Sequence, residues 1–461
     1  MAIVLLGFGL RVYKLTSSPS GLYIDETSIA YNAWSVLVTG KDEHGKTFPL
    51  FFEAFGEWKL PVYIYAVVLT QLFTGPTDAS VRIAAVIFGT LSIVWTALFV
   101  KELLKTHSPQ LAANAGLLAA FSLLVSPWHF QYTHAGFEAS SAFFFLSLGL
   151  WLFMLAWGKK SSVWLTISLL SFIGALYAYN SSRIVVPALL IVLFILYLKQ
   201  FSWRQWIIAF GCTILLVLPF ISFSLSPAGW ARARQISFLY DEKYQGRKAE
   251  LLVKNYLANL SPIYLFYRGD PTIDHDSRHR MGLLYPIELP LILIALGWII
   301  RSGKKELWLL PLVFMIGLVP PAITTLVPHA LRGLMTVVGS SSLSGLGMAI
   351  IVARLKKPPL KLLAMSLYTI ILIGLSLRFL QIYHTMYIKE AESDWLTHIK
   401  VTGEKVRNIT PRYSYVFFEP GLNGISMWWN LRLPPAIFQA TNDKAQIGNF
   451  VFDVKSENEI P

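Results

Sequence analysis

Long apolar segments alternate with short polar ones along most of the chain. A helix that spans a lipid bilayer needs about 20 largely apolar residues, and stretches near that length recur as far as residue 382. We predict eleven membrane-spanning helices, at residues 2–14, 81–101, 111–127, 139–157, 162–179, 184–198, 206–224, 284–300, 306–323, 333–353 and 362–382. The pattern predicts an all-α polytopic membrane domain over residues 1–382.

The placement of basic residues predicts the orientation of these helices. Short loops rich in Lys and Arg stay on the cytoplasmic side of a membrane. Such loops lie at 101–105, 158–160, 199–204, 301–305 and 354–361, each between two consecutive predicted spans. All of these basic loops fall on the same side of the membrane only if the apolar stretch 60–74 does not cross the membrane. We therefore expect an interfacial or re-entrant helix there. The N-terminus is then cytoplasmic, in a multi-pass protein of the cell membrane.

Composition supports the membrane class and excludes a nucleic-acid partner. The chain is 55% hydrophobic and 14% charged, a balance typical of polytopic membrane proteins. Its net charge of +13 collects in the predicted cytoplasmic loops, where it matches anionic membrane lipids. No soluble segment shows a basic stripe interleaved with aromatic residues.

Residues 383–461 are more polar than the rest of the chain. Their composition predicts strands near 413–418, 435–439 and 448–454, so we expect a small external α/β domain. Its adjacent residues Trp428 and Trp429 are either core residues or a carbohydrate-stacking platform, and core is the favoured interpretation.

The first predicted outer loop, residues 15–80, carries two adjacent carboxylates, Asp25 and Glu26. Removing a carboxylate from water at a membrane boundary costs free energy, and such groups are default candidates for function. The alternative is structural: Asp25 caps a short helix, with Glu26 in its first turn.

Polar residues at several outer helix ends indicate one shared cavity that opens outward. Cations at this boundary suit an anionic head group, and Arg suits phosphate through its planar guanidinium. The candidates for donor-phosphate binding are Lys59, Arg82, Arg183, His329 and Arg332. Further candidates that line the cavity are His129, His134, Glu138, Tyr177, Tyr179, Asp270 and His279. Membrane anchoring or helix capping is the alternative role of the five cationic candidates.

A carboxylate beside a phosphate-linked leaving group suits general-base activation of a hydroxyl. The implied reaction is group transfer from a lipid phosphate to a hydroxyl or amine acceptor. Whether a divalent metal takes part stays open, because one carboxylate pair neither demands nor excludes such an ion. The outer segment 268–280 holds three acids and two histidines, but their spacing fits no standard zinc pattern and favours a solvated loop.

The order of these motifs on alternate sides of the predicted spans is similar to that of a known superfamily. The motifs are RVYKLTSSPSGLYIDETSIAYNAW, SPWHFQYTHAGFE, LYAYNSSRIVVP and PPAITTLVPHALRG, within roughly residues 8–385. The chain resembles the GT-C membrane glycosyltransferases, in particular the dolichyl-phosphate-mannose protein mannosyltransferase and aminoarabinose transferase superfamily. It departs from the pattern at His134, where the resemblance leads us to expect Arg.

The resemblance implies an inverting transfer from a polyprenyl-phosphate sugar. It implies that Asp25 is the catalytic base and that Glu26 supports either Asp25 or an optional metal. The growing charge on the leaving polyprenyl phosphate would be met by the cationic candidates. The acceptor, whether lipid, glycan or protein, is not determined by the resemblance.

Two other functions compete with this one. A transporter or lipid flippase would show an internal repeat and functional charges near the bilayer midplane, whereas this chain shows no repeat and its charges cluster at one face. A non-enzymatic envelope scaffold would leave the outer acids and bases without a common cavity.

Close packing of helices, as in membrane bundles, is expected for the small residues SSSLSGLG at 340–347.

Overall fold

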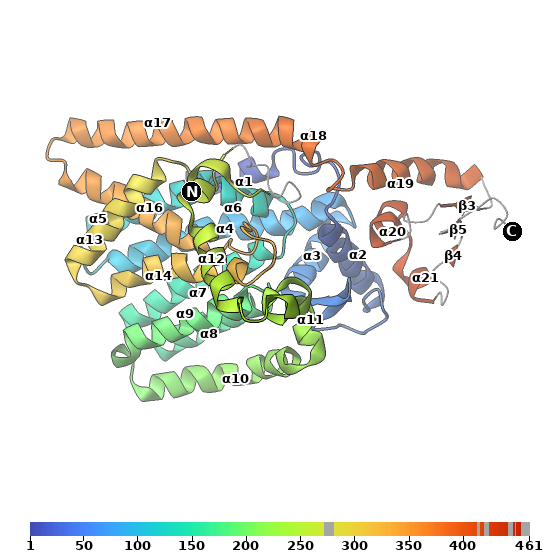
Figure 1. Cartoon of the computed structure of the whole chain (residues 1–461), viewed down its shortest axis with the longest axis horizontal. Helices are drawn as coiled ribbons and strands as arrows, with labels where there is room; N and C mark the ends of the chain where they lie inside the picture. The colour runs from blue at the N-terminus through green and yellow to red at the C-terminus, as the bar shows by residue number, and fades with distance from the viewer. Residues whose placement is uncertain (272–280, 413–414, 419–423, 441–445, 448, 453–461) are drawn as a thin grey trace. The chain divides into compact units, whose positions relative to one another are not determined.

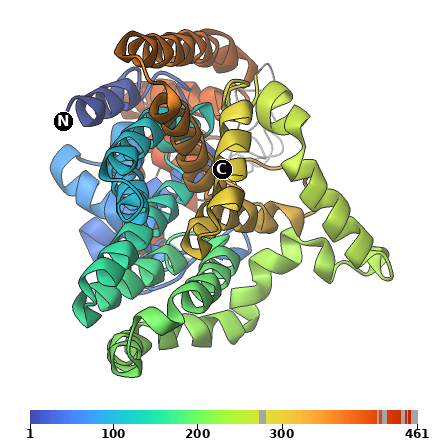
Figure 2. The same cartoon turned by 90° about the vertical axis from the view of Figure 1, so that its left-hand side faces the viewer.

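The structure of the chain is a computed structural model, and it describes residues 1–271, 281–412, 415–418, 424–440, 446–447 and 449–452. Most of these residues are helical (Figures 1 and 2). They form two compact units. Unit one contains residues 1–13 and 85–382, and unit two contains residues 14–84 and 383–461.

Seven helices among the described residues are long and apolar enough to cross a membrane. They are α4 (Asp78–Leu104), α7 (Ala139–Lys159), α9 with η1 (Ser182–Gln200), α10 (Trp203–Leu225), η5 to α15 (Lys305–Ala322), α16 (Thr336–Arg354) and α17 to α18 (Pro358–Glu390). The pair α5 (Pro109–Val125) and α6 (Pro127–His134), bent by 59°, is an eighth candidate. The chain is therefore a multi-pass membrane protein by the length and composition of its helices.

The predicted number of eleven spans is not confirmed. Each predicted segment falls on a helix, but three of these helices are short, namely α1 (Ala2–Val12), α8 (Ser162–Leu176) and α13 (Glu288–Ser302). A 15-residue helix is about 22 Å long, against a hydrocarbon core of about 30 Å. The stretch 60–74 forms the short apolar helix α3 (Pro61–Thr74), and its interfacial placement stays a prediction.

The candidate span Lys305–Ala322 consists of η5 (Lys305–Trp308), α14 (Leu309–Gly317) and α15 (Val319–Ala322). The remaining helices of unit one are short. They are α11 (Pro227–Ile236), η2 (Phe238–Tyr240), η3 (Glu242–Tyr244), α12 (Lys248–Leu260) and the π-helix η4 (Tyr264–Arg268). Pro227 begins α11 directly after Ser226, whose hydroxyl accepts from Gly229 N. Proline at the first helical position after a Ser cap is a common way to begin a helix.

Helix α16 forms the centre of unit one, where it packs against α5, α13 and α14. All residues of its segment 340–347 are buried. A Cβ added at Gly345 would collide with the backbone of Ala119, and one at Gly347 would collide with the carbonyl of Leu291. The predicted close packing at 340–347 is therefore confirmed, because only glycine allows the two neighbouring backbones to approach this helix.

Unit two is built around α2 (Ile24–Thr39), which packs against α3, α20 (Ile425–Leu431) and α21 (Pro435–Ala440). Gly40 ends α2 in the left-handed conformation, with φ 69°, as is common at helix C-termini. The strands β1 (Phe52–Ala54) and β2 (Glu57–Lys59) pair antiparallel. The other elements are η6 (Tyr383–Tyr387), α18 (Ile388–Glu390), α19 (Thr397–Ile409), η7 (Thr410–Arg412), β3 (Val416–Phe417), β4 (Gln446–Ile447) and β5 (Phe450–Val451).

The strand predictions for the C-terminal region are partly right. Strand β3 lies within 413–418 and β5 within 448–454; β5 pairs parallel to β3 and antiparallel to β4. The strand predicted at 435–439 is wrong, because this stretch forms α21. Pro435 begins that helix, and its fixed φ suits the first helical turn. Trp429 is fully buried, as expected for a core residue, whereas Trp428 is half-buried.

The residues that follow 382 pack with the first predicted outer loop, although the two are far apart in the sequence. Tyr31 on α2, for example, donates a hydrogen bond of 3.0 Å to the carbonyl of Leu433. We predicted a membrane domain, 1–382, and an external domain, 383–461. Contacts between residues do not show which of them lie inside the membrane, so they do not test this division. That division stays a prediction.

We predict that Gly347→Ala lowers the melting temperature of the purified protein, because a backbone carbonyl cannot move aside for the new methyl group. Overpacking of this kind costs about 1–3 kcal/mol. Gly374→Ala on α17 is the matched control, since nothing lies within 4 Å of its added Cβ. We expect the control to keep or raise the melting temperature in a detergent-based unfolding assay. Equal effects of the two substitutions would contradict the packing of α16.

Candidate functional site

The adjacent carboxylates Asp25 and Glu26 lie in the first turn of α2 but have different surroundings. The Glu26 side chain is fully buried, while 28% of the Asp25 side chain is exposed. The residue that precedes the helix is Tyr23, so the alternative in which Asp25 is the cap is wrong. Glu26 instead accepts the Tyr23 backbone N–H at 3.0 Å. Glu26 therefore satisfies an N-terminal donor of the helix.

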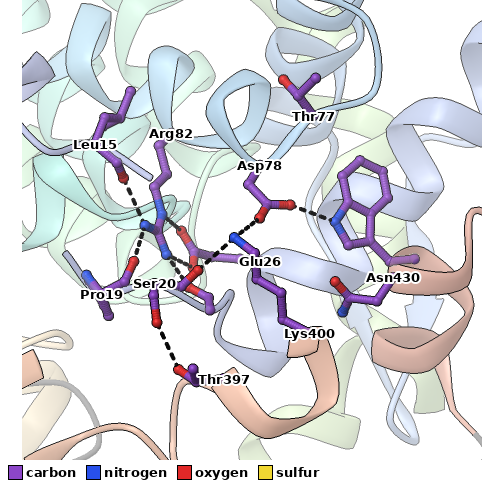
Figure 3. A network of polar contacts seen from close by, with 12 residues as sticks. Leu15, Pro19, Ser20, Glu26, Thr77, Asp78, Arg82, Thr397, Lys400 and Asn430 are labelled. Carbon is purple, nitrogen blue, oxygen red and sulfur yellow. Dashed lines mark hydrogen bonds and ion pairs between the residues drawn. The ribbon is translucent and has the colours of Figure 1, made fainter. Parts of the chain in front are cut away.

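Glu26 forms a buried bidentate ion pair with Arg82, one turn into α4. Arg82 Nε donates to Glu26 Oε1 at 2.9 Å, and Nη2 donates to Oε2 at 3.0 Å. Nη1 donates to the carbonyls of Leu15 at 2.8 Å and Pro19 at 2.7 Å, and Nη2 also donates to the carbonyl of Gly21 at 2.6 Å. Figure 3 shows these contacts around the guanidinium group.

All five N–H groups of Arg82 are engaged within the protein, since a guanidinium has five donors. In this arrangement Arg82 has no N–H to offer to a phosphate. We therefore propose a positioning role for Arg82, in place of the phosphate-binding role that its place at the outer end of a predicted span suggested.

Asp25 pairs with Lys59, and this contact brings two of the predicted site residues together. Lys59 ends β2 and is buried. Its Nζ donates to Asp25 Oδ1 at 2.7 Å. Because Lys59 is buried, it is not a lysine that merely snorkels along the surface. The pair combines a partly exposed carboxylate, which can accept a proton, with an ammonium group, which can contact a phosphate.

A second carboxylate from the same loop, Glu43, lies against α2 and was given no role from the sequence. Glu43 Oε1 accepts from Asn32 Nδ2 at 2.9 Å, and its backbone N–H donates to Asn32 Oδ1 at 3.1 Å. Asn32 lies two helical turns after Asp25 and thus on the same face of α2. Burial raises the pKa of Glu43 to about 7, against the opposing charge of Lys59. The second Asp–Glu pair of the loop, at 42–43, was the available signal in the sequence.

In unit one, His129 belongs to a buried polar network that the sequence did not indicate. Arg11 Nη2 lies 2.8 Å from His129 Nδ1, and Ser92 Oγ lies 3.0 Å from His129 Nε2. Because Arg can only donate, Nδ1 is the acceptor and Nε2 carries the proton. Arg11 Nε also donates to Thr133 at 2.8 Å. This network joins α1, α4 and α6.

Other predicted cavity residues of unit one are held by local contacts. His134 is buried, and its Nε2 lies 3.1 Å from the carbonyl of Tyr13. Tyr177 donates to the carbonyl of Leu216 at 2.9 Å. Glu138 directly precedes α7, and Tyr179 is half-buried in the turn before α9. Their lining of a cavity stays a prediction.

The structure places Asp270, His329 and Arg332 near one another. Asp270 Oδ2 accepts the backbone N–H of Ala330 at 2.6 Å, directly after His329. His329 is buried and Arg332 is half-buried. Both precede α16: His329 lies outside regular secondary structure, and Arg332 lies in a turn.

Arg183 is the second residue of α9 and lies beside two aromatic rings. Its Nη1 donates to the carbonyl of Gly229 at 2.6 Å, and its guanidinium lies 5.4 Å from the ring centres of Phe220 and Phe223. Arg183, His329 and Arg332 belong to unit one, whereas Asp25 and Lys59 belong to unit two. One cavity shared by both groups stays a prediction. His279 lies outside the described residues.

The described residues contain no group of three or more His, Cys, Asp or Glu side chains that could hold a metal ion. Most of the segment 268–280, where acids and histidines alternate, lies outside the described residues. A divalent metal therefore stays a prediction to be tested in solution.

No protein-family model matches the sequence, and no curated protein matches it significantly. Solved structures do match. ArnT from Cupriavidus metallidurans bound to undecaprenyl phosphate superimposes with a TM-score of 0.53 and 12% identity, over 97% of this chain and 89% of ArnT. The archaeal oligosaccharyltransferase AglB from Archaeoglobus fulgidus, in complex with an inhibitory peptide and a dolichol-phosphate, gives 0.56 and 13%, over 93% of this chain and 63% of AglB.

The oligosaccharyltransferase of Archaeoglobus fulgidus in complex with Zn and sulfate gives a TM-score of 0.55 and 14% identity, over 93% of this chain and 61% of that one. This chain thus spans less than two thirds of the archaeal enzyme. Both neighbours are GT-C superfamily members. The likeness confirms the GT-C fold that the sequence predicted, and at this identity it shows the fold alone.

We predict that Glu26→Gln destabilises the protein by about 3–5 kcal/mol, because it leaves the buried charge of Arg82 without its counter-ion. The matched control is Glu250→Gln. Glu250 receives two hydrogen bonds from Arg247, both of 3.2 Å, but that pair is exposed. Its loss should cost about 0–1 kcal/mol. Chemical unfolding in detergent compares the two variants, and similar losses would show that burial of the Glu26–Arg82 pair has little energetic effect.

Glu43 gives the protein a pH dependence with a definite sign. Its pKa in the folded state, about 7, exceeds the ordinary value of 4.5. The folded state therefore binds more protons between these values, and stability falls as pH rises through that window, on the order of 3 kcal/mol in total. Glu43→Gln should reduce this fall when melting temperatures at pH 5 and pH 8 are compared.

The control for this experiment is Glu53→Gln in the same loop. A hydrogen bond from Lys46 lowers the pKa of Glu53, so that carboxylate is already ionised throughout the window. Glu53→Gln should leave the decrease in melting temperature between pH 5 and pH 8 unchanged. If Glu43→Gln shows the same decrease as the wild type, Glu43 is not the source of this pH dependence.

Proposed function

We propose that this protein is an integral-membrane glycosyltransferase that moves a sugar from a polyprenyl-phosphate donor to an acceptor on the non-cytoplasmic face of the cell membrane. The contact of 2.7 Å between Asp25 and Lys59 carries this proposal. It places a proton acceptor beside a cation on a GT-C fold. One fold neighbour is bound to undecaprenyl phosphate and another is in complex with a dolichol-phosphate, which supports a lipid-linked donor.

In the proposed reaction, Asp25 accepts the proton of the acceptor hydroxyl or amine while the acceptor atom attacks the anomeric carbon. The bond from that carbon to the phosphate oxygen breaks, and its electron pair leaves with the polyprenyl phosphate. Attack and departure on opposite sides invert the anomeric centre. The proton ends on Asp25, and the negative charge ends on the phosphate.

Lys59 is proposed to stabilise the leaving phosphate. Its ammonium group contacts Asp25, so it is proposed both to orient the base and, through its positive charge, to meet the charge that grows on the phosphate oxygen. Electrostatic stabilisation of this kind is often the largest contribution to catalysis. Arg183, His329 and Arg332 are further proposed contacts of the lipid phosphate, in place of Arg82.

The N-terminus is proposed to be cytoplasmic, because the basic loops then face the cytoplasm. The acceptor is a lipid, a glycan or a protein, and the sugar is not specified by the observed contacts. A divalent metal is tested by chelation: activity lost in EDTA and restored by Mg²⁺ or Mn²⁺ would establish a requirement.

We predict that Asp25→Asn lowers the rate of sugar transfer by about 10²–10⁴-fold, the usual contribution of a general base. The assay follows a labelled sugar from a polyprenyl-phosphate donor in vesicles that contain the purified protein. Asp241→Asn, which alters a half-buried carboxylate paired with Lys243 at 3.0 Å, is the control and should keep full activity. Wild-type turnover by Asp25→Asn would remove Asp25 from the mechanism.

A further inference from the structure

The C-terminal region of unit two holds the start of α4 through two hydrogen bonds to one carboxylate. Asp78 lies in the first turn of α4, one turn before Arg82. Lys400 Nζ on α19 donates to Asp78 Oδ2 at 2.8 Å, and Trp429 Nε1 on α20 donates to Oδ1 at 2.9 Å. Both oxygens of the carboxylate are thus bound from residues more than three hundred positions away in the sequence.

Helix α19 also contacts the segment 15–21, whose carbonyls accept hydrogen bonds from Arg82. Lys400 Nζ donates to the carbonyl of Ser20 at 2.8 Å, and the Ser20 and Thr397 hydroxyls lie 3.1 Å apart. These contacts appear beside the Arg82 group in Figure 3. A side chain at Gly21 would collide with the carbonyl of Trp395, so the backbones of the two segments are in direct contact there.

The other contacts of the C-terminal region run along α2 itself. The hydroxyls of Thr27 and Ser426 lie 2.8 Å apart. Further along, Gln439 Nε2 donates to Ser35 Oγ at 2.8 Å and to the carbonyl of Asp42 at 2.8 Å. The helix that carries Asp25 is therefore in contact with the C-terminal region at both ends.

These contacts form a short path to the proposed base. Lys400 and Trp429 bind Asp78, which precedes Arg82 by one helical turn, and Arg82 binds Glu26, which is the neighbour of Asp25. A negative charge in the first turn of a helix is already favoured by the helix dipole. The Asp78 side chain is only 13% exposed, so Lys400 and Trp429 also offset the cost of removing its charge from water. The same two contacts join the start of α4 to α19 and α20.

We propose that α19, α20 and α21 position the catalytic helix α2, and that Lys400 and Trp429 are positioning residues for Asp25. This inference rests on the proposed function, because it assigns a task to the C-terminal region in that same reaction. A displacement of about 1 Å at a reacting group can lower a rate by about 100-fold. Loss of these contacts should therefore affect turnover more than donor binding.

The first experiment compares Lys400→Met with Lys405→Met, an exposed lysine on the same helix. Sugar transfer is measured well below the melting temperature of both variants and is normalised to folded protein. We expect Lys400→Met to lower kcat by about tenfold or more while KM for the polyprenyl-phosphate donor changes less than twofold. Lys400→Arg should restore most of kcat, because it keeps a cation at Asp78.

Trp429→Phe tests the same contact if Lys400→Met does not fold, since it keeps an aromatic ring and removes only the N–H donor. We expect it also to lower kcat without raising KM. Wild-type kcat in Lys400→Met or Trp429→Phe would overturn the inference, as would an equal loss in Lys405→Met.

A second measurement does not depend on activity. Hydrogen exchange of the backbone amides at residues 24–31 should be faster in Lys400→Met than in Lys405→Met, and unchanged exchange would overturn the inference. The two proposals fail separately. If Asp25→Asn keeps full turnover, the proposed function fails, whereas an inactive Asp25→Asn beside a fully active Lys400→Met refutes only the positioning role.

Discussion

The buried pair of Glu26 and Arg82 is the interaction on which the arrangement of unit two depends. Removing two charges from water costs several kcal/mol for each ion. Here the cost is offset by a bidentate contact and by three backbone carbonyls, from Leu15, Pro19 and Gly21. The carbonyls all come from the segment 15–21, and the two side chains come from α2 and α4, so the pair is stable only when these three segments are in place.

This constraint explains why two adjacent acids have separate tasks. Neighbouring residues of a helix point about 100° apart, so Glu26 faces the interior and Asp25 reaches the partly exposed side of α2. Glu26 accepts hydrogen bonds from Arg82 and from the N-terminus of α2, while Asp25 accepts one from Lys59 on β2. The structural acid fixes the helix, and the fixed helix presents the proposed catalytic acid. The C-terminal region adds a second set of contacts to the same helix.

Hydropathy predicted the location of the helices well, because burial in lipid leaves a long apolar signal in the sequence. It could not determine the number of spans, since helices such as α1 and α8 are apolar but shorter than the roughly 20 residues that a span needs. The strand at 435–439 was wrong because apolar β-forming residues there follow two prolines that suit a helix start. Residue type and place in the loop made both Asp25 and Lys59 candidates, and the structure shows that they form an ion pair; their roles stay predictions.

Other features of the site could not be read from the sequence. The sequence pattern of an arginine at the outer end of a span does not show what its guanidinium contacts. We expected Arg82 to contact a phosphate, but here it contacts Glu26 and a set of backbone carbonyls. The contacts of Lys400 and Trp429 with Asp78 join residues more than three hundred positions apart, and no periodicity reports such a pairing. Arg11, buried beside His129, was hidden within an apolar run for the same reason.

The most direct test of the central claim asks whether Asp25 and Lys59 act as one unit. Single-turnover sugar transfer is measured in the wild type, in Asp25→Asn, in Lys59→Met and in the double variant. Residues that act together show strongly non-additive losses, so the double variant should be no slower than about the slower single variant. Losses that simply multiply, or a double variant with wild-type turnover, would contradict the account.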